Sequence, residues 1–164
     1  MQLEQRNITD LLAYEGNARV HSERQVGQIM DSIKAFGFCN PVLIDKRGTI
    51  IAGHGRVMAA KQLNMDTVPV IVLPHLNDAQ CRALTLADNR IAMNAGWDEQ
   101  LLSQELTRLK IDGFDMDMLG FTMTEINLYT VDPTEFTPEG MHLQGRLDER
   151  SKTRCPSCGH EFTA

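Results

Sequence analysis

Two short β-branched segments flank a charged turn, and a glycine-rich loop leads from the second of them into a helix pattern. Residues 41–44 and 49–52 are spaced as the two strands of a β-hairpin. The loop 53–56 (Gly-His-Gly-Arg) follows directly, and 57–63 has a helical composition. Two glycines between a strand and a helix let the backbone approach a bound group closely. This feature restricts the chain to folds that mix strands with helices.

Capping residues mark the starts of three further helices. Ser22 and Gln25 fit a capping box, and apolar residues at helical spacing follow them. Asn77 or Asp78 caps a second helix, and Asp98 caps a third. Helices are therefore predicted on both sides of the hairpin in sequence.

Apolar runs outside the hairpin supply the remaining strands. The first 16 residues predict a brief strand or an extended lead-in. Residues 68–73 predict a buried strand with Pro69 at its start, where no ladder donor is needed. We therefore predict an α+β fold with a small mixed sheet of about four strands and packed helices.

Length and composition limit this fold to one domain with an appendage. The chain has 164 residues, and residues 7–130 are predicted to form the domain. Prolines and glycines interrupt 131–154, which we interpret as a linker, and 155–162 form a compact knuckle. The chain has no run of about 18 apolar residues, and its first six residues form no apolar signal core, so we expect no membrane partner and a cytoplasmic location.

The charge of the chain is unevenly distributed. The net charge is −6, but residues 1–97 carry ten basic and nine acidic side chains, whereas residues 98–130 carry two basic and seven acidic ones. This balance argues against a protein that coats DNA by charge alone. A phosphate-binding surface is expected within the first 97 residues.

Arg56 gives the loop 53–56 the chemistry of an anion cradle. It falls in the first turn of the predicted helix, where free amides and the positive end of the helix dipole favour an anion. Its planar guanidinium can hold a phosphate through two hydrogen bonds. The residues alone leave a second interpretation open, a tight turn that carries a surface arginine.

The segments 32–44 and 50–61 resemble the ParB/sulfiredoxin superfamily in order and spacing, and the resemblance covers residues 7–130. It implies that the loop Gly53, His54, Gly55 and Arg56 binds nucleotide phosphates. Asn17-Ala18-Arg19 resembles the first family box, which implies that Asn17 and Arg19 face the nucleotide. Leu86-Ala87-Asp88-Asn89-Arg90 resembles a later box, in which the acidic residue and the asparagine help to hold Mg²⁺ and phosphate.

A narrower resemblance covers residues 14–121, which are similar to the ParB-like region that precedes the catalytic domain of phage and prophage DNA methyltransferases. Stand-alone phage ParB-like proteins are also similar. No DPPY or NPPY motif occurs in this chain, so methyltransferase activity is not carried over. No convincing counterpart of the ParB helix-turn-helix is present, which weakens a role in sequence-specific partition.

The loop departs from the family pattern at His54. Family members that hydrolyse CTP usually carry glutamate there, and sulfiredoxin has a reactive cysteine in this loop, so sulfinic acid reduction is not expected. His54 is a candidate to bind phosphate as imidazolium or to act as an acid or base, or else it points into solvent. Asp88 and Asn89 have a second interpretation as a C-terminal helix cap. We interpret His21 as a loop residue beside the Ser22 cap.

The C-terminal segment contains the other candidate metal site. Cys155 and Cys158 form a CxxC turn that can direct two thiolates at one Zn²⁺, with His160 as a third candidate ligand. His142 is a further candidate, and a site shared by two chains would make a homodimer. The alternative is a free dithiol. Cys39 and Cys81 stand in apolar stretches and are interpreted as core residues.

These residues support two functional hypotheses. The first is a ParB-like protein of phage or mobile-element DNA metabolism, modification or partition. It binds a nucleoside triphosphate such as CTP or ATP with Mg²⁺ and could act as a slow triphosphatase. The second is a non-enzymatic DNA-binding or adaptor protein that recruits a DNA methyltransferase or nuclease. A ParB-like nuclease is a weaker third hypothesis, because the sequence has no evident carboxylate cluster for it.

Overall fold

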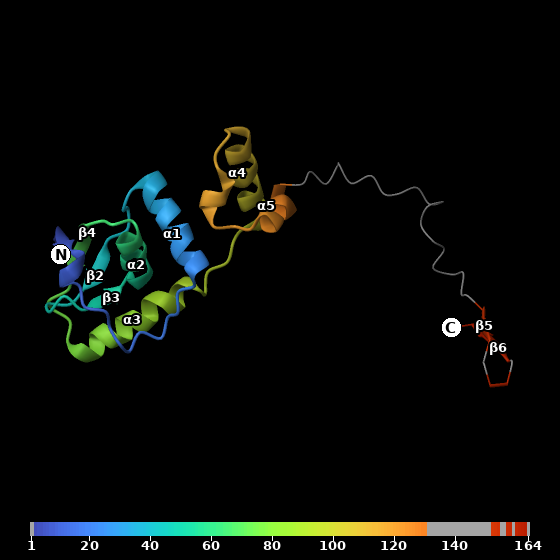
Figure 1. The fold of residues 1–164 in the computed structure, drawn as a ribbon, viewed down its shortest axis with the longest axis horizontal. Helices are drawn as coiled ribbons and strands as arrows, with labels where there is room; N and C mark the ends of the chain where they lie inside the picture. The colour runs from blue at the N-terminus through green and yellow to red at the C-terminus, as the bar shows by residue number, and fades with distance from the viewer. Residues whose placement is uncertain (1, 131–151, 155–156, 159, 164) are drawn as a thin grey trace. The chain divides into compact units, whose positions relative to one another are not determined.

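The computed structural model describes residues 2–130, 152–154, 157–158 and 160–163 (Figure 1). Residues 1–130 form one compact unit, and residues 131–164 form a second. The elements of the first unit are β1 (Leu3–Asn7), η1 (Ile8–Asp10), α1 (Glu23–Phe36), β2 (Val42–Ile44), β3 (Ile50–Ala52), α2 (His54–Gln62), β4 (Thr67–Val72), α3 (Asp78–Ala92), α4 (Glu99–Ile111), η2 (Met116–Leu119) and α5 (Met123–Thr130).

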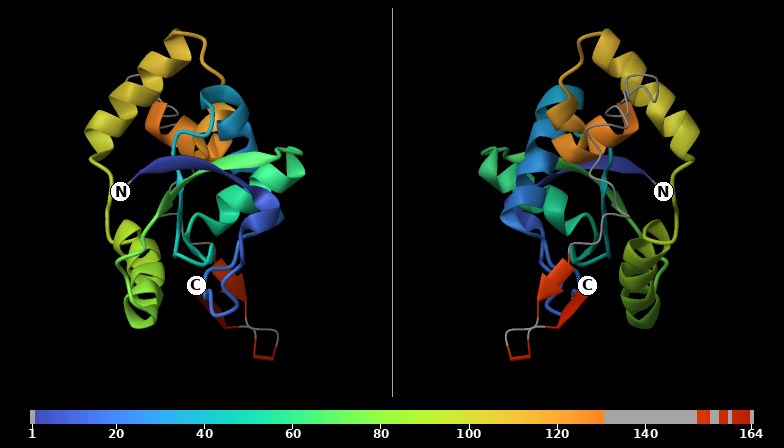
Figure 2. Two further views of the ribbon diagram at one scale, coloured as in Figure 1. Left: turned by 90° about the vertical axis from the view of Figure 1, so that its left-hand side faces the viewer. Right: turned by 90° about the vertical axis from the view of Figure 1, so that its right-hand side faces the viewer.

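The sheet of the first unit is mixed and has the strand order β1-β4-β2-β3. β4 pairs antiparallel with β1 and parallel with β2, and β2 pairs antiparallel with β3 as the predicted hairpin. Both views of Figure 2 show β1 beside β4. The predicted α+β architecture with a small mixed sheet is therefore confirmed.

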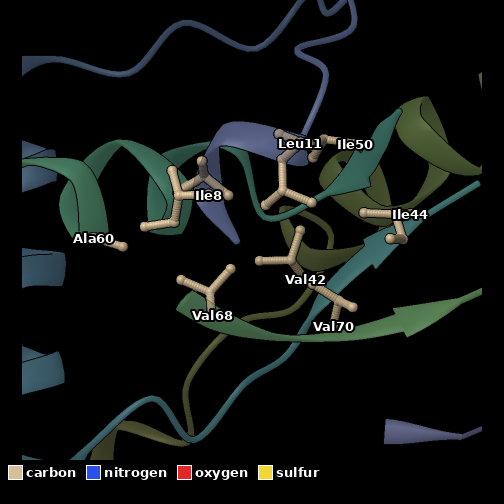
Figure 3. Packing of buried hydrophobic residues seen from close by; sticks show 9 residues of the cluster. Ile8, Leu11, Val42, Ile44, Ile50, Ala60, Val68 and Val70 are labelled. Atoms are coloured by element: carbon tan, nitrogen blue, oxygen red, sulfur yellow. The ribbon is translucent and has the colours of Figure 1, made fainter. Parts of the chain in front are cut away.

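The main core lies between the sheet and the segments η1 and α2 (Figure 3). Alternate residues of β2 and β4 point into it, as the period of two along a strand requires. The buried residues of α2 are small, Gly55, Val57, Ala59 and Ala60, which lets the helix pack closely. The cluster consists of Ile8, Leu11, Val42, Ile44, Ile50, Val57, Ala60, Val68 and Val70.

Local capping signals set the helix starts as predicted. The Ser22 hydroxyl accepts a hydrogen bond from the Gln25 amide, and the Asp98 carboxylate caps α4. Asn77, rather than Asp78, caps α3 through a complete capping box. The Gln25 side chain does not close its own box, because it hydrogen-bonds a neighbouring histidine ring instead.

Pro69 departs from its predicted place. It is the third residue of β4, inside the strand. The parallel ladder to β2 begins only at Val70, one residue further along, so on that side Pro69 precedes the pairing. A proline is tolerated where a strand lacks a ladder partner.

The buried carboxylate of Asp45 helps to connect the hairpin to α3. Asp45 is only 4% exposed. It accepts hydrogen bonds from the amides of Arg47 and Thr49 at 2.8 Å each and from Arg47 Nε at 3.0 Å. The other side of the Arg47 guanidinium reaches Asp78 at the start of α3, at 3.0 Å. One residue network therefore closes the hairpin turn and anchors the helix.

Two cysteines, Cys39 and Cys81, were predicted to be core residues. Cys81 is partly buried, but Cys39 is exposed, so that prediction is wrong for Cys39. Its thiol lies just past the end of α1 and donates to the Phe36 carbonyl at 2.9 Å.

The second unit contains β5 (Lys152–Arg154) and β6 (Glu161–Thr163), which pair antiparallel with Arg154 opposite Glu161. β5 occupies the last three residues of the predicted linker 131–154. The rest of that linker, including His142, lies outside the described residues, as does Cys155. Among the described residues, no helix has the length and apolar character needed to cross a membrane.

Candidate functional site

The loop after β3 leaves backbone amides free at the start of α2. Gly53 has φ +99° and ψ 22°, a left-handed conformation that side chains disfavour. It is the N-cap of α2 but has no side chain to cap the helix, and the first turn holds no acidic residue. The amides of that turn therefore remain available to an anion.

A pocket of about 140 Å³ lies at this loop, and we call it the loop pocket. It gathers residues from four separate parts of the chain: the segment before α1, α1 itself, the loop 53–56 and α3. Every residue that the sequence predicts for nucleotide or Mg²⁺ binding lines it. The lining residues are Asn17, Arg19, His21, Ile29, Gly53, His54, Gly55, Arg56, Asp88 and Asn89.

Arg56 makes contacts that the sequence does not predict. Its Nη1 donates to the carbonyl oxygens of Asn40 at 2.5 Å and Pro41 at 3.0 Å, which fastens the segment that leads into β2. A Cβ atom at Gly53 would lie 3.2 to 3.3 Å from the guanidinium, so the glycine makes room for it. Burial lowers the pKa of Arg56, while the Asp88 carboxylate acts in the opposite direction. Arginine stays charged in any case, with donors beyond Nη1 to offer a ligand.

Asn17 and Arg19 lie on the wall formed by the segment before α1. The Asn17 side chain accepts from the Arg19 amide at 3.2 Å and donates to the Arg19 carbonyl at 3.4 Å, so its amide group holds the local backbone. Arg19 Nη1 donates to Met93 Sδ, just beyond α3, at 3.1 Å. Asn17 therefore shapes the wall, and Arg19 links it to the end of α3.

Asp88 and Asn89 lie inside α3, which continues to Ala92 and has Met93 as its C-cap. The alternative interpretation of the pair as a helix cap is therefore wrong. Asn89 Nδ2 donates to the Thr85 carbonyl at 2.8 Å, which leaves Oδ1 as the free end of its amide. A carboxylate and an amide oxygen fit a Mg²⁺ that takes its other ligands from phosphates and water. The described residues hold no group of three metal-ligating side chains, so a dedicated protein cage is not built here.

The pocket contains a second histidine that the sequence did not indicate as a pocket residue. His21 lies on the same wall as Asn17 and Arg19, and these three residues are partly buried while Ala18 and Val20 between them are exposed. Their spacing of two is the signal that could have found it, because alternate residues of an extended segment face the same side.

The C-terminal candidates are only partly placed. Cys158 and His160 are exposed, and Cys155 lies outside the described residues. The β5–β6 pairing brings together the two ends of the segment that contains both cysteines.

Comparisons with known proteins identify the family of this chain. Residues 4–90 match the ParB N-terminal domain. The "ParB-like nuclease domain-containing protein YnaK" of Escherichia coli K12 is 61% identical over 75 residues, which cover 46% of this chain and 86% of that protein. An uncharacterized protein, ORF326b, of the Acidianus two-tailed virus is 37% identical over 68 residues, 41% of this chain and 21% of the viral protein.

The fold has a solved counterpart. The truncated chromosome-partitioning protein ParB of Caulobacter crescentus, solved with CTP-gamma-S, superposes with a TM-score of 0.57 at 20% identity, covering 79% of this chain and 71% of that one. The match to the domain spans more than half of the present sequence, from β1 to the Asp88–Asn89 pair. The chain therefore belongs to the ParB N-terminal domain family.

Proposed function

We propose that the first unit binds a nucleoside triphosphate with Mg²⁺, placing the phosphates in the loop pocket, and that this binding serves a ParB-like role on DNA. The main support for this proposal is the set of residues that line the loop pocket. Free amides, His54 and Arg56 line it from the loop 53–56, His21 lines it from the segment before α1, and Asp88 and Asn89 line it from α3. This set supplies donors for phosphate and hard oxygen ligands for a magnesium ion.

The size of the pocket fits phosphate groups, and a neighbouring groove has room for the nucleoside. The groove runs between α1 and η2, has a volume of about 860 Å³, and shares Ile29 and Arg56 with the loop pocket. A whole ligand site usually needs about 300 to 1,000 Å³, which the 140 Å³ of the loop pocket alone does not provide.

Calorimetric titration with each of the four ribonucleoside triphosphates, with and without Mg²⁺, tests this proposal. Binding of at least one of them that Mg²⁺ strengthens supports it. Wild-type protein that is folded and binds none of the four contradicts it. Release of inorganic phosphate over hours separates a binder from a slow triphosphatase, for which His54 is the candidate acid or base.

The Mg²⁺ part of the proposal predicts the effect of Asp88→Asn. Asp88 and Oδ1 of Asn89 would hold the ion, which neutralises phosphate charge when bound. Loss of the carboxylate should weaken triphosphate binding in Mg²⁺ by about tenfold or more, and by much less in EDTA. Because Asp88 lies inside the helix rather than at its end, the melting temperature should change little.

Asp66→Asn is the control for that variant. It makes the same chemical change at an exposed residue outside the loop pocket. Equal losses for the two variants in Mg²⁺, or a loss for Asp88→Asn that persists unchanged in EDTA, would show that Asp88 does not serve the metal.

We also propose that the C-terminal segment binds Zn²⁺ through Cys155 and Cys158. The support is the β5–β6 ladder, which brackets the CxxC turn. A closed site needs two further ligands. If two chains share one ion, the zinc content should be about 0.5 per chain, and a chelator should dissociate a dimer. If His160 and another local group complete the site, the zinc content should be about 1 per chain, and the chelator should not change the molecular mass. Metal analysis with light scattering measures both, and zinc-free protein purified under reducing conditions contradicts the proposal.

For the role on DNA we propose one function and consider one alternative. The relatives named above include a chromosome-partitioning ParB and a viral protein, which supports a function in the maintenance of mobile-element or phage DNA. The alternative is an adaptor that recruits a DNA methyltransferase or nuclease without using nucleotide. A DNA-binding assay with and without triphosphate distinguishes the two, because only the first predicts that nucleotide changes the affinity for DNA.

A further inference from the structure

His54 lines the loop pocket and carries an unsatisfied buried polar atom. Its Nε2 is buried and has no hydrogen-bond partner, and no other buried side-chain nitrogen or oxygen within the described part of the chain is left in this way. A buried polar atom without a partner lowers the stability of the fold. A ligand atom that forms a hydrogen bond with Nε2 would remove this cost.

His21 lies close to His54 and is held in a defined orientation. Its Nδ1 contacts Gln25 Oε1 at 3.0 Å, and since a glutamine oxygen only accepts, Nδ1 carries the proton. The ring packs against the first turn of α2, where a Cβ atom on Gly55 would lie 3.0 Å from His21 Cε1 and Nδ1. Nε2 is therefore the nitrogen of His21 that can gain a proton.

The surroundings disfavour a charged His54 ring in the absence of an anion. Burial, followed by the proximity of His21, lowers the pKa of His54 below its ordinary value. Among the other pocket residues, Arg19 and Arg56 carry positive charge, Asp88 carries negative charge from α3, and Ile29 of α1 is apolar. A phosphate dianion placed among these groups would favour the charged form of the ring, because it stabilises a charged imidazolium.

We propose that His54 and His21 form a proton-accepting pair, in which His54 Nε2 donates to a bound phosphate and the pair takes up one proton from solvent as the phosphate binds. The proton joins Nε2 of one ring, and no other bond changes. This inference rests on the proposed function, because it assigns the phosphate end of the same ligand. It predicts a pH-dependent affinity that a pocket of arginines alone would not show.

The sign of the pH dependence follows from linkage. Below the pKa of the free pair the proton is already bound, and affinity is at its highest. Between the pKa of the free pair and that of the complex, affinity should fall by about tenfold per pH unit, and it should level off above the latter. Nucleotide would therefore be held more tightly on the acidic side of neutrality.

Inorganic tripolyphosphate without Mg²⁺ is the probe, because it lacks base, sugar and metal. Calorimetry near neutral pH in two buffers of different ionisation enthalpy measures the protons taken up. Wild type should take up about 0.5 to 1 proton more than His54→Gln or His21→Gln, and its affinity should fall about tenfold between roughly pH 6 and pH 8 where theirs falls less than threefold. His75→Gln, an exposed histidine outside the pocket, should behave as wild type.

NMR of the unmodified chain gives a second measurement that needs no variant. The ring Cε1–H signals of His54 and His21 should titrate at higher pH when tripolyphosphate is present, and that of His75 should not change. Equal proton uptake in wild type and variants, or ring signals that ignore the probe, would overturn the inference while nucleotide binding stands. Failure of every nucleoside triphosphate to bind would overturn the proposed function and this inference together.

Discussion

Arg56→Ala is expected to lower the affinity for the nucleoside triphosphate by about 10- to 100-fold, because it removes a charge-assisted contact to phosphate. The same change deletes the hydrogen bonds from Nη1 to the Asn40 and Pro41 carbonyls, which should lower the free energy of unfolding by about 1 to 2 kcal/mol. Affinity should therefore be measured by calorimetry at a temperature where the melting curve shows the variant to be fully folded.

One further variant separates the charge of Arg56 from its shape, and a second serves as a control for charge elsewhere on α2. Arg56→Lys keeps the charge but loses the planar fork, so its affinity should lie between those of wild type and Arg56→Ala. Lys61→Ala removes a positive charge from the exposed end of the same helix and should leave affinity within about twofold, since screened surface charges contribute little. An alanine variant that is folded and binds as tightly as wild type would contradict the assignment of Arg56 to phosphate.

Asp45→Ala is expected to lower the free energy of unfolding by about 2 to 3 kcal/mol, a large share of a typical total. The carboxylate is buried, and its removal leaves the Arg47 and Thr49 amides and Arg47 Nε without their acceptor. It also frees Arg47, which ties the hairpin to Asp78 of α3. Urea denaturation followed by circular dichroism measures the loss. Asp31→Ala, which breaks an exposed pair with Lys34, is the control and should cost less than about 1 kcal/mol.

The pH dependence of this effect has a definite sign. Burial alone would raise the pKa of Asp45, but the hydrogen bonds from Thr49 and Arg47 outweigh it and hold the pKa below its ordinary value. The stabilisation from Asp45 is therefore fully present above the pKa of the unfolded chain, about 3.9, and is lost as the pH falls through the lower pKa of the folded state. The stability gap between wild type and Asp45→Asn should shrink on acidification below about pH 4; a constant gap down to pH 2 would show that ionisation of Asp45 is irrelevant.

Elements with strong local signals were predictable from the sequence. The hairpin of β2 and β3, and the starts of α1 and α4, depend on turn and capping residues that act within a few positions of each other. β1 gave a weaker signal, because Glu4, Gln5 and Arg6 stand in it. Its pairing with the distant β4 holds it in place, and no local pattern reports that pairing.

In the candidate site, too, the sequence indicated individual residues but not the contacts between distant segments. The resemblance singled out residues on three segments, and the structure brings those segments to one pocket. What it did not supply are contacts that exist only in three dimensions. Arg56 bonds carbonyls 15 and 16 residues away, and His21 reaches the first turn of α2 because Gly55 leaves room for its ring.

The position of β4 in the sheet has a consequence for synthesis of the protein. β4 is the last of the four strands to leave the ribosome, yet β1, the first, has no other neighbour in the sheet. At usual synthesis rates β1 therefore waits roughly 3 to 13 s for a partner. An unpaired strand invites wrong pairing, and charged residues reduce that risk. The polar residues Glu4, Gln5 and Arg6 gave little indication of a strand. They are suited to protect β1 from wrong pairing while it has no partner on the nascent chain.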